Sequence, residues 1–352
     1  MPPQKRRQIT LKQVAEQAGV HVSTASRALN ADTRSMVVSA VAERVIATAN
    51  QLGYRADPVA ASLRTGRSKL VGILAPDISN TVFGSILSGA SERLAATGYT
   101  VIVADVGNDT DRQLELAARL FARRVDGLIL ATARQHDPVV DFCLQRHCPA
   151  ILVNRAEVQA RLSTVVSDDE HGMQLAVDHL VSLGHRKIGH IAGPAEHSTG
   201  YRRRRGFARA MAKHELTKRA SYQVTKAYSR EEGAAAARRL FDTMPSVSAI
   251  VAANDLLALG VYDTMHERGL KCPRDVSVVG HNDMPLVDMV EPPLTTVRIG
   301  HREMGRQAAE LLRQAIESVD PLTQSIVLRP VLIVRQSTAP LQPTIAKSRK
   351  HL

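Results

Sequence analysis

No stretch of this 352-residue sequence approaches the roughly 20 consecutive apolar residues that cross a bilayer. Its start, MPPQKRRQIT, is basic but lacks the apolar core and the small-residue cleavage site of a secretory signal. The only three cysteines, Cys143, Cys148 and Cys272, form no CxxC pair and have no histidine at zinc-finger spacing. We therefore expect a cytoplasmic protein with no membrane partner, no disulfide framework, no metal site and no cofactor.

The common catalytic motifs are also missing. The sequence contains no GxSxG, no GxGxxG after a predicted strand and no Walker loop. His171, His185, His190 and His197 lack the HExxH-type spacing of a metalloprotease, so they are expected to be surface or core residues. Missing motifs are weak evidence against a hydrolase or a dehydrogenase; the basic head of the chain is what favours a binding protein.

Positive charge is concentrated at the start of the chain. The net charge is +12, and residues 1–70 carry eleven basic against four acidic side chains, so they account for +7 of it. The other 282 residues share the remaining +5. A small basic module joined to a larger, nearly neutral one indicates a head that binds a polyanion and a body with another task.

The head is predicted to consist of short helices. Thr10 and Gln13 have the spacing of a capping box, and apolar residues then recur at helical spacing until Gly19. A second helix is expected over about 22–29 and a third over about 39–52, closed by Gly53. The segment 57–64 has an acidic cap and a proline at its first helical position, but is too short to be stable alone, which suggests a conditional helix.

The body has the rhythm of parallel β-α-β units. Short apolar runs alternate with helical-length segments; the runs are Leu70–Ala75, Thr100–Asp105, Gly127–Ala131, Ala150–Val153, Lys187–Ala192, Ala249–Ala252 and Val276–Gly280, and the helical segments include Ala234–Phe241 and Leu256–Arg268. The pattern restarts near Lys187, which predicts two similar α/β lobes. Ligands of open α/β sheets bind beyond the carboxyl ends of the strands, so a cleft between the lobes is the expected ligand site.

Several runs of residues resemble one family of regulators. ITLKQVAEQAGVHVSTASRALN and LGYRADPVAASLRTGRS are similar to the DNA-binding head and hinge of the lactose-repressor/galactose-repressor (LacI/GalR) family of transcription regulators. VGILAPDISNTVFGSILSGAS, HLVSLGHRKIGHIAGP, RRRRGFARAM, ANDLLALG, VSVVGHNDM and EPPLTTVRI resemble that family's ligand-binding core. The resemblance extends from about Ile9 to Ala339.

The resemblance implies an α/β protein with an N-terminal all-α helix-turn-helix head and hinge helix, followed by a two-lobe periplasmic-binding-protein-like core. The expected parts are the head (1–56), the hinge and linker (57–68), the effector-binding and dimerisation core (69–340) and a basic tail (341–352). Within the core we expect one lobe at about 69–167 plus 300–325 and the other at about 168–299 plus 326–340. A DNA-binding repressor controlled by a small metabolite is the implied function; a cytoplasmic α/β enzyme or binding protein with a non-regulatory nucleic-acid-binding head is the alternative.

The resemblance also implies how the head meets double-stranded DNA. The second helix would enter the major groove, where Arg27 could read guanine and Val22 a thymine methyl. Leu63 of the hinge helix would wedge into the minor groove when two copies pair. The complete set of expected DNA-binding residues is Thr10, Val22, Ser23, Thr24, Ser26, Arg27, Asn30, Tyr54, Ala60 and Leu63.

Two features of the head depart from the family's pattern. His21 replaces the usual serine cap of the second helix. Near the third helix, apolar Val38, Val41 and Ala42 replace residues that contact phosphates in the family, for which Thr33 and Arg34 could compensate.

One short recognition helix reads few bases, so we expect a homodimer on a near-palindromic operator. The tail after Ala339 lacks the apolar heptads of a tetramerising coiled coil.

Residues that follow the predicted strands are the candidates for binding the effector. They are Asp77, Phe83, Thr132, Asn154, Arg155, Asp168, His197, Arg203, Asn254, Asp255 and Asn282. The family resemblance supports Arg203, Asn254 and Asn282 most directly. Asp168 and Asp255 could instead cap helices, Asn154 could end a strand, and Phe83 could be a core residue.

The charge of the effector is predicted from one substitution. Asn282 stands where sugar-binding members of the family commonly place an aspartate, so Arg203 would lose a counter-charge. An arginine fork in a cleft with few carboxylates suits an anionic metabolite such as the sugar acid gluconate, and a protonated His197 would add to this preference. If Asp168, Asp255 or Asp283 supplies the missing charge, a neutral sugar or a nucleobase fits equally well.

Overall fold

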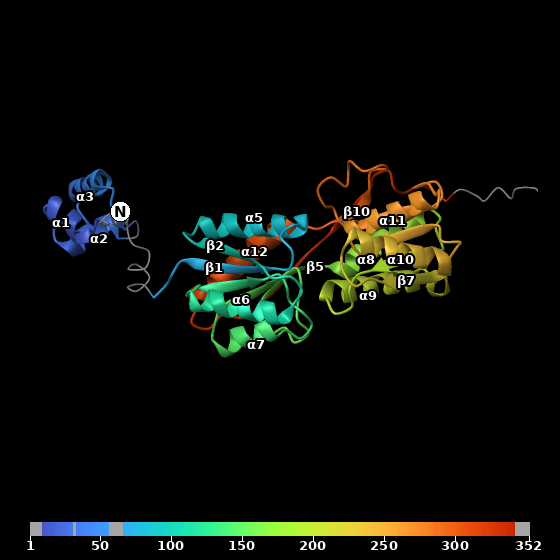
Figure 1. The fold of residues 1–352 in the computed structure, drawn as a ribbon, viewed down its shortest axis with the longest axis horizontal. Coiled ribbons are helices and arrows are strands. Elements are labelled where there is room, and N and C mark those ends of the chain that lie inside the picture. Colours follow the sequence, from blue (N-terminus) through green and yellow to red (C-terminus); the bar gives the residue numbers. More distant parts are fainter. Residues whose placement is uncertain (1–8, 31–32, 56–65, 342–352) are drawn as a thin grey trace, which may run out of the picture. The chain divides into compact units, whose positions relative to one another are not determined.

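The computed structural model describes residues 9–30, 33–55 and 66–341 (Figure 1). The chain divides into two units, one ending at Ser68 and the other beginning at Lys69. The whole of the predicted hinge helix (57–64), including Ala60 and Leu63, lies outside the described residues, as does the tail after Leu341.

The first unit is a three-helix head. Its elements are α1 (Leu11–Gln17), α2 (Val22–Leu29), the 3₁₀ turn η1 (Arg34–Met36) and α3 (Ser39–Leu52). All three helices contribute small apolar side chains to one core, in which Val14, Ala25 and Val45 are completely buried. The helix positions agree with those predicted from the apolar periodicity.

Local hydrogen bonds explain where the head helices begin and end. Thr10 and Gln13 form the capping box in both directions, because each side chain bonds to the other residue's backbone N–H. Gly53 closes α3 with a left-handed φ of 65°. His21, expected to be a poor cap, does cap α2: its Nδ1 accepts from the Ser23 backbone N–H at 3.3 Å and lies 2.8 Å from the Ser23 hydroxyl.

The second unit contains two six-stranded sheets, each covered by helices on both faces. The first has the order β11-β5-β4-β3-β1-β2, with all pairs parallel. Its strands are β1 (Leu70–Ala75), β2 (Thr100–Asp105), β3 (Gly127–Leu130), β4 (Ala150–Val153), β5 (Thr164–Ser167) and β11 (Ser325–Leu328). Helices α5 (Thr81–Ala95) and α12 (His301–Glu317) cover one face, and α6 (Thr110–Ala122) and α7 (Pro138–Gln145) the other.

The second sheet has the order β12-β10-β9-β8-β6-β7 and one antiparallel pair, β10 with β12. Its strands are β6 (Ile188–Ala192), β7 (Ala220–Val224), β8 (Ala249–Ala252), β9 (Ser277–Asn282), β10 (Thr295–Arg298) and β12 (Val331–Ile333). Helices α8 (Asp169–Ser182) and α9 (Ser198–Lys213) pack on one face, and α10 (Arg230–Thr243) and α11 (Asp255–Glu267) on the other. A 3₁₀ turn, η2 (Thr217–Arg219), precedes β7.

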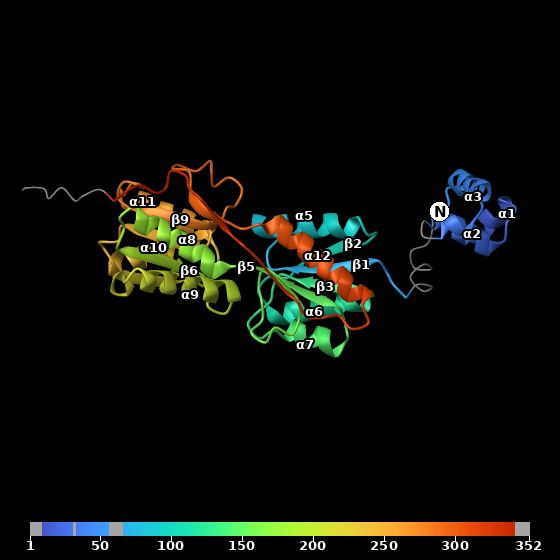
Figure 2. The same ribbon diagram turned by 180° about the vertical axis from the view of Figure 1, so that it is seen from behind.

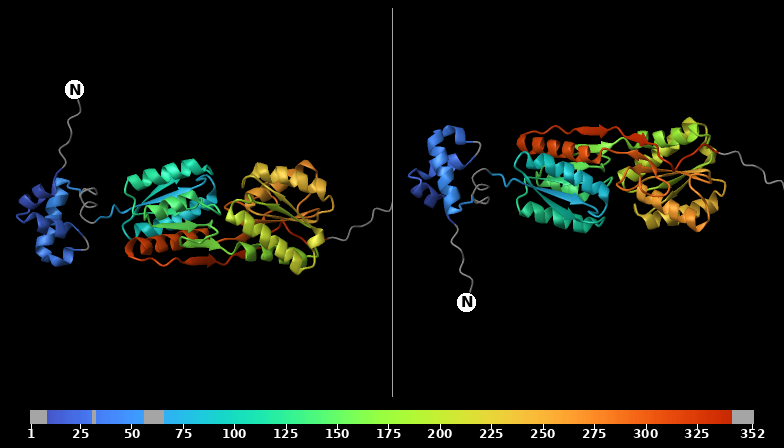
Figure 3. Two further views of the ribbon diagram at one scale, coloured as in Figure 1. Left: turned by 90° about the horizontal axis from the view of Figure 1, so that it is seen from below. Right: turned by 90° about the horizontal axis from the view of Figure 1, so that it is seen from above.

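The chain passes between the two lobes at three places, which can be followed in Figures 2 and 3: from β5 to α8, from β10 to α12 and from β11 to β12. The sequence analysis placed the last crossing, where the chain leaves the first lobe, at about residue 325, which is a few residues too early. Ser325–Leu328 continue the first sheet by pairing with Thr164–Ser167, so the chain leaves that lobe only after Leu328.

The central strands are buried apolar runs, as expected for sheets covered on both faces. Asn80, Asp109, Asp137 and Ser229 each cap the helix that follows a strand or loop, which makes the turns after the strands polar. No helix within residues 9–30, 33–55 or 66–341 has the combined length and apolar character needed to cross a membrane.

Candidate functional site

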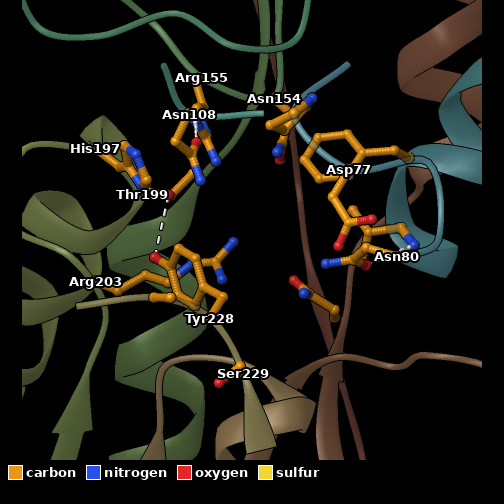
Figure 4. A pocket seen from close by; sticks show the side chains of 15 residues that line it. Asp77, Asn80, Asn108, Asn154, Arg155, His197, Thr199, Arg203, Tyr228 and Ser229 are labelled. Atoms are coloured by element: carbon orange, nitrogen blue, oxygen red, sulfur yellow. Dashed lines mark hydrogen bonds between the residues drawn. The ribbon is translucent and has the colours of Figure 1, made fainter. Parts of the chain in front are cut away.

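A cavity of about 180 Å³ lies between the two lobes, where the turns after their strands face each other (Figure 4). The structure brings seven of the predicted effector residues to it: Asp77, Phe83, Asn154, Arg155, His197, Arg203 and Asn282. The volume is below the range of roughly 300–1,000 Å³ that is usual for drug-sized ligands, so the cavity suits a small metabolite.

The structure also places residues in the cavity that the sequence analysis did not identify: Asn80, Asn108, Thr199, Tyr228 and Ser229, with Pro76, Val82 and Ala227. Asn80 and Ser229 cap helices, a pattern that is visible in the sequence. Tyr228 follows β7, a strand that the sequence analysis did not predict. Its side chain lies against Gly193, where an added Cβ would come within 2.4 Å of two ring carbons and of the hydroxyl oxygen, and that hydroxyl lies 3.1 Å from Thr199 Oγ1.

Four other candidates do not line this cavity. Asn254 Oδ1 accepts from the Leu257 backbone N–H at the start of α11, and Asp168 caps α8 in the same way. Asp255 is buried and accepts from Thr296 Oγ1 at 2.6 Å and from the Met284 backbone N–H at 2.8 Å. Thr132 is also buried, behind Arg155. Asp255 therefore anchors the loop after Asn282 rather than facing the cavity.

Arg203 has a counter-charge, contrary to the prediction from Asn282. Its Nε donates to Asp169 Oδ1 at 2.8 Å and its Nη1 donates to the Ala253 carbonyl at 2.7 Å. The arginine is only 3% exposed. Burial works to lower its pKa, but the charge and hydrogen bond of Asp169 raise it. The residue that supplies the charge is Asp169, which was not among the candidates; Asp283 is paired with Arg298 and Arg335.

Arg155 differs from Arg203 in having no carboxylate partner among the residues that the structure describes. It is 5% exposed, and its Nη1 has two long contacts, both at 3.4 Å, to Asn108 Oδ1 and to the Thr132 carbonyl. Burial lowers the pKa of Arg155 to about 10; the charge of Arg134 acts in the same direction, whereas Tyr228 and the more distant charges of Glu196 and Asp137 act to raise it. The guanidinium therefore remains charged at neutral pH. The cavity therefore contains a buried cation that forms no ion pair with any residue in the described part of the chain.

His197 is neutral in this environment, so the expected contribution from its protonated form is wrong. Burial, followed by the charges of Arg155 and Arg134, lowers the pKa of His197 to about 3. The ring is stacked on Tyr228 with centroids 6.3 Å apart, and its Nδ1 is buried with no hydrogen-bond partner among the described residues. A neutral imidazole can donate one hydrogen bond to a bound hydroxyl or accept one from it.

Unusual backbone conformations occur on both sides of the cavity. Asn154, directly after β4, has φ 64°, and Asn282, at the end of β9, has φ 116°. Such values are uncommon for residues other than glycine and cluster at functional sites, where they direct side chains and N–H groups toward ligands. Figure 4 shows Arg155, Asn108, His197 and Thr199 together on one side of the cavity, with Asp77 and Asn80 on another.

The head presents a polar face on α2. Val22, Ser23 and Arg27 are exposed, whereas Thr24, Ser26 and Asn30 are half-buried. No carboxylate of the described residues forms an ion pair with Arg27. Tyr54 packs against the core of the head, and its backbone N–H donates to Ala49.

Thr33 and Arg34, which were expected to compensate for missing phosphate contacts, bond instead to the end of α2. Thr33 Oγ1 donates to the Arg27 carbonyl at 3.2 Å, and Arg34 Nε donates to the Ala28 carbonyl at 3.1 Å. Both bonds supply donors to carbonyls that have no hydrogen-bond partner within the last turn of the helix. They hold Thr33 and Arg34 against the end of α2.

A helical head joined to a two-lobe ligand-binding core defines a class of DNA-binding regulators, and comparison with known proteins agrees. Residues 10–57 match the model described as bacterial regulatory proteins, lacI family, and residues 177–338 match a periplasmic binding protein-like domain. The chain is 34% identical over 341 residues to the HTH-type transcriptional regulator reg1 of Streptomyces lividans, covering 94% of this chain and 96% of the relative. It is 31% identical over 335 residues to the HTH-type transcriptional regulator DegA of Bacillus subtilis (strain 168), covering 94% of this chain and 98% of the relative. The chain belongs to the LacI family.

Solved structures of the same class cover nearly the whole chain. The lac repressor dimer bound to operator and the anti-inducer ONPF is 27% identical and superposes with a TM-score of 0.83, covering 95% of this chain and all of that one. The complex of the regulator CelR with cellobiose is 28% identical, with a TM-score of 0.72 over 94% of this chain and all of that one. The predicted family and fold class are thereby confirmed.

Proposed function

We propose that this protein is a transcriptional repressor that binds a near-palindromic operator as a homodimer, and that a small anionic metabolite in the cavity between the lobes controls its operator affinity. The evidence for a negatively charged effector is Arg155, a cation that is 95% buried and has no carboxylate partner among the described residues. The family and the exposed face of α2 support the DNA-binding part.

The anionic ligand follows from the energetics of buried charge. An isolated buried cation is unfavourable unless a counter-charge and hydrogen bonds offset its lost hydration. Arg203 has both, through Asp169 and the Ala253 carbonyl, whereas Arg155 has two long contacts to neutral oxygens. A carboxylate or phosphate could accept two parallel hydrogen bonds from the Arg155 guanidinium. Arg155, rather than the predicted Arg203, is therefore the proposed anion-binding group.

The remainder of the ligand would be polar and hydroxylated. His197, Thr199, Asn80, Asn108 and Asn154 supply neutral donors and acceptors around the cavity. Amide, hydroxyl and imidazole groups match the alternating donors and acceptors of a polyol. Together with Arg155, this lining suits a sugar acid such as gluconate or a sugar phosphate.

On the DNA side, Arg27 and Val22 are exposed on α2, the second helix of a helix-turn-helix, where they can contact base edges in the major groove. A single helix of eight residues reads only a few base pairs. Two copies on a near-palindromic site would double the number of contacts, which is why we propose a homodimer.

The effector would act by changing the relative orientation of the lobes. Arg155 belongs to the first lobe, whereas His197 and Thr199 begin α9 of the second, so a ligand that contacts all three bridges the lobes. Two direct bonds already cross the lobes nearby, from the Ala156 backbone N–H to Ser198 Oγ at 2.9 Å and from Gln135 to the Ala195 carbonyl at 3.0 Å. A ligand affects DNA binding only if its affinity differs between the DNA-bound and free states.

The test begins with the selection of operator sequences from random DNA by the full-length protein. Retention of the selected DNA is then measured with matched pairs of compounds: aldose against aldonate, and each against its phosphate. Calorimetry with the wild type, Arg155→Gln and the exposed control Arg123→Gln follows. We expect the anionic member of a pair to bind more tightly, Arg155→Gln to lose this preference and Arg123→Gln to retain it.

Tighter binding of the neutral member, for example of a sugar such as the cellobiose in the CelR complex, would refute the anionic effector but not the regulator. Failure to enrich any DNA sequence, with the head folded by circular dichroism, would refute the DNA-binding function itself. Sedimentation that gives a monomer or a stable tetramer would contradict the proposed dimer.

A further inference from the structure

Two cysteines meet at the end of α7, on the face of the first lobe away from α5 and α12. The helix ends in a Schellman motif: the Cys148 backbone N–H donates to the Cys143 carbonyl at 2.9 Å, and the His147 N–H donates to the Leu144 carbonyl at 3.2 Å. His147 supplies the left-handed residue of the motif, with φ 50°. Cys143 and Cys148 thus occupy the two positions whose side chains pack together in this motif.

Where other helices place two apolar side chains, α7 places two thiols. Both cysteines are free and buried, Cys143 completely and Cys148 to 94%, and their side chains lie close enough for each to shift the pKa of the other. Cys148 Sγ also lies 3.8 Å from the Pro149 carbonyl oxygen. The backbone bond between the two residues holds their Cα atoms close, which is the first requirement for a disulfide.

We propose that Cys143 and Cys148 are an oxidisable dithiol that a hydroperoxide converts into an internal disulfide at the end of α7. This modification site lies outside the effector cavity and does not depend on the proposed function.

The chemistry is a two-step transfer of oxygen and electrons. The Cys148 thiolate attacks a peroxide oxygen, the O–O bond breaks, and Cys148 becomes a sulfenic acid with release of water or of an alcohol. The Cys143 sulfur then attacks the Cys148 sulfur and displaces hydroxide, which takes up the proton from the Cys143 thiol and leaves as water. Two thiols are oxidised and one peroxide is reduced. A dithiol reductant reverses the reaction by thiol–disulfide exchange.

Cys148 is assigned as the attacking residue for two reasons. It is 6% exposed, whereas Cys143 is 0% exposed, so a small oxidant reaches it first. The hydrogen bond from the Cys143 thiol lowers the pKa of Cys148, because it stabilises the thiolate. Residues 144–147, which connect the two cysteines, are all exposed, and brief opening of this last turn would admit a peroxide.

Cys272 serves as an internal comparison. It is half-buried, its thiol lies 3.4 Å from the Ser337 carbonyl oxygen, and it lies in the other lobe, in the loop between α11 and β9. Burial raises the pKa of Cys272 to about 12. Because its pKa is raised and neither of the other two cysteines lies in its lobe, Cys272 should react slowly with a peroxide.

The experiment treats the full-length protein with hydrogen peroxide, alkylates the remaining thiols after denaturation and maps the peptides by mass spectrometry. We expect the three thiols of the chain to fall to one, with Cys272 alkylated, Cys143 linked to Cys148, and all three recovered after treatment with dithiothreitol. Cys272→Ser should form the same link at the same rate. Cys143→Ala removes both the second thiol and the group that lowers the pKa of Cys148, so Cys148 should oxidise more slowly and stop at a sulfenic acid that dimedone traps.

Two results would overturn the proposal: Cys143 and Cys148 both remaining reduced at a peroxide dose that oxidises Cys272, or a disulfide that joins Cys272 to either of them. Because the wild-type map alone distinguishes these outcomes, the test holds even if the alanine variant does not fold.

Discussion

Replacing Arg155 with methionine should make the ligand-free protein more stable while abolishing its response to an anion. Methionine has a similar length and no charge, so it can occupy the same buried space. The charged guanidinium of Arg155 is destabilised by burial, which lowers its pKa from 12.5 to about 10. At about 1.36 kcal/mol per pKa unit, this shift corresponds to an unfavourable contribution on the order of 3 kcal/mol at neutral pH.

The expected gain is smaller than this value, because Asn108 and the Thr132 carbonyl lose their contacts with the guanidinium. We expect the free energy of unfolding of Arg155→Met to rise by about 1–3 kcal/mol, as when other buried charges are replaced by apolar residues. The sign is opposite for Arg203→Met. There the substitution leaves the buried Asp169 unpaired, which should destabilise the protein by about 3–5 kcal/mol.

The assay is urea unfolding followed by far-ultraviolet circular dichroism, with and without the anion selected by calorimetry. An anion at about 100 times its Kd should stabilise the wild type by about 2.7 kcal/mol and Arg155→Met by much less. Arg123→Met, on the exposed end of α6, should change stability by less than about 0.5 kcal/mol. If Arg155→Met destabilises the ligand-free protein as Arg203→Met does, Arg155 is already satisfied by its surroundings and the reasoning is refuted.

Three further predictions concern other parts of the molecule. Gly193→Ala should reduce effector affinity at least tenfold by calorimetry while operator binding remains, because the added Cβ would displace the Tyr228 ring; unchanged affinity would remove Tyr228 from the site. Acid should destabilise the body: burial lowers the pKa of His190 to about 4 and of His301 to about 3, so the folded form resists protonation while the unfolded chain binds protons below about pH 6.5. The contribution of each neutral histidine to the free energy of unfolding is thus complete above about pH 6.5 and falls by about 2 kcal/mol per group by pH 5. His190→Gln should therefore make the free energy of unfolding, measured with urea, depend less on pH. Arg27→Ala should relax base preference at one or two operator positions in a DNA selection; a uniform loss of affinity at all positions would instead assign Arg27 to a phosphate.

Local patterns were sufficient to predict the helices of the head and the central strands of the body. The capping box at Thr10, the helix end at Gly53 and the buried run Leu70–Ala75 depend on neighbours within a few residues, and the structure agrees with each. The strands that were missed, β5, β7, β10, β11 and β12, are short, and three of them lie at sheet edges. Their apolar pattern is weak because part of each edge strand faces solvent.

The cavity itself was predicted in outline, since residues after parallel strands meet at one edge of a sheet, and seven of these candidates do line it. The electrostatic roles within it were not predictable. Arg203 and Asp169 are 34 residues apart, and only the packing of α8 against α9 brings them within 2.8 Å. The sequence alone determines which charged groups the chain carries and which strand ends present them. The tertiary structure decides which of those charges are paired, because pairing depends on distances between elements that no local pattern specifies.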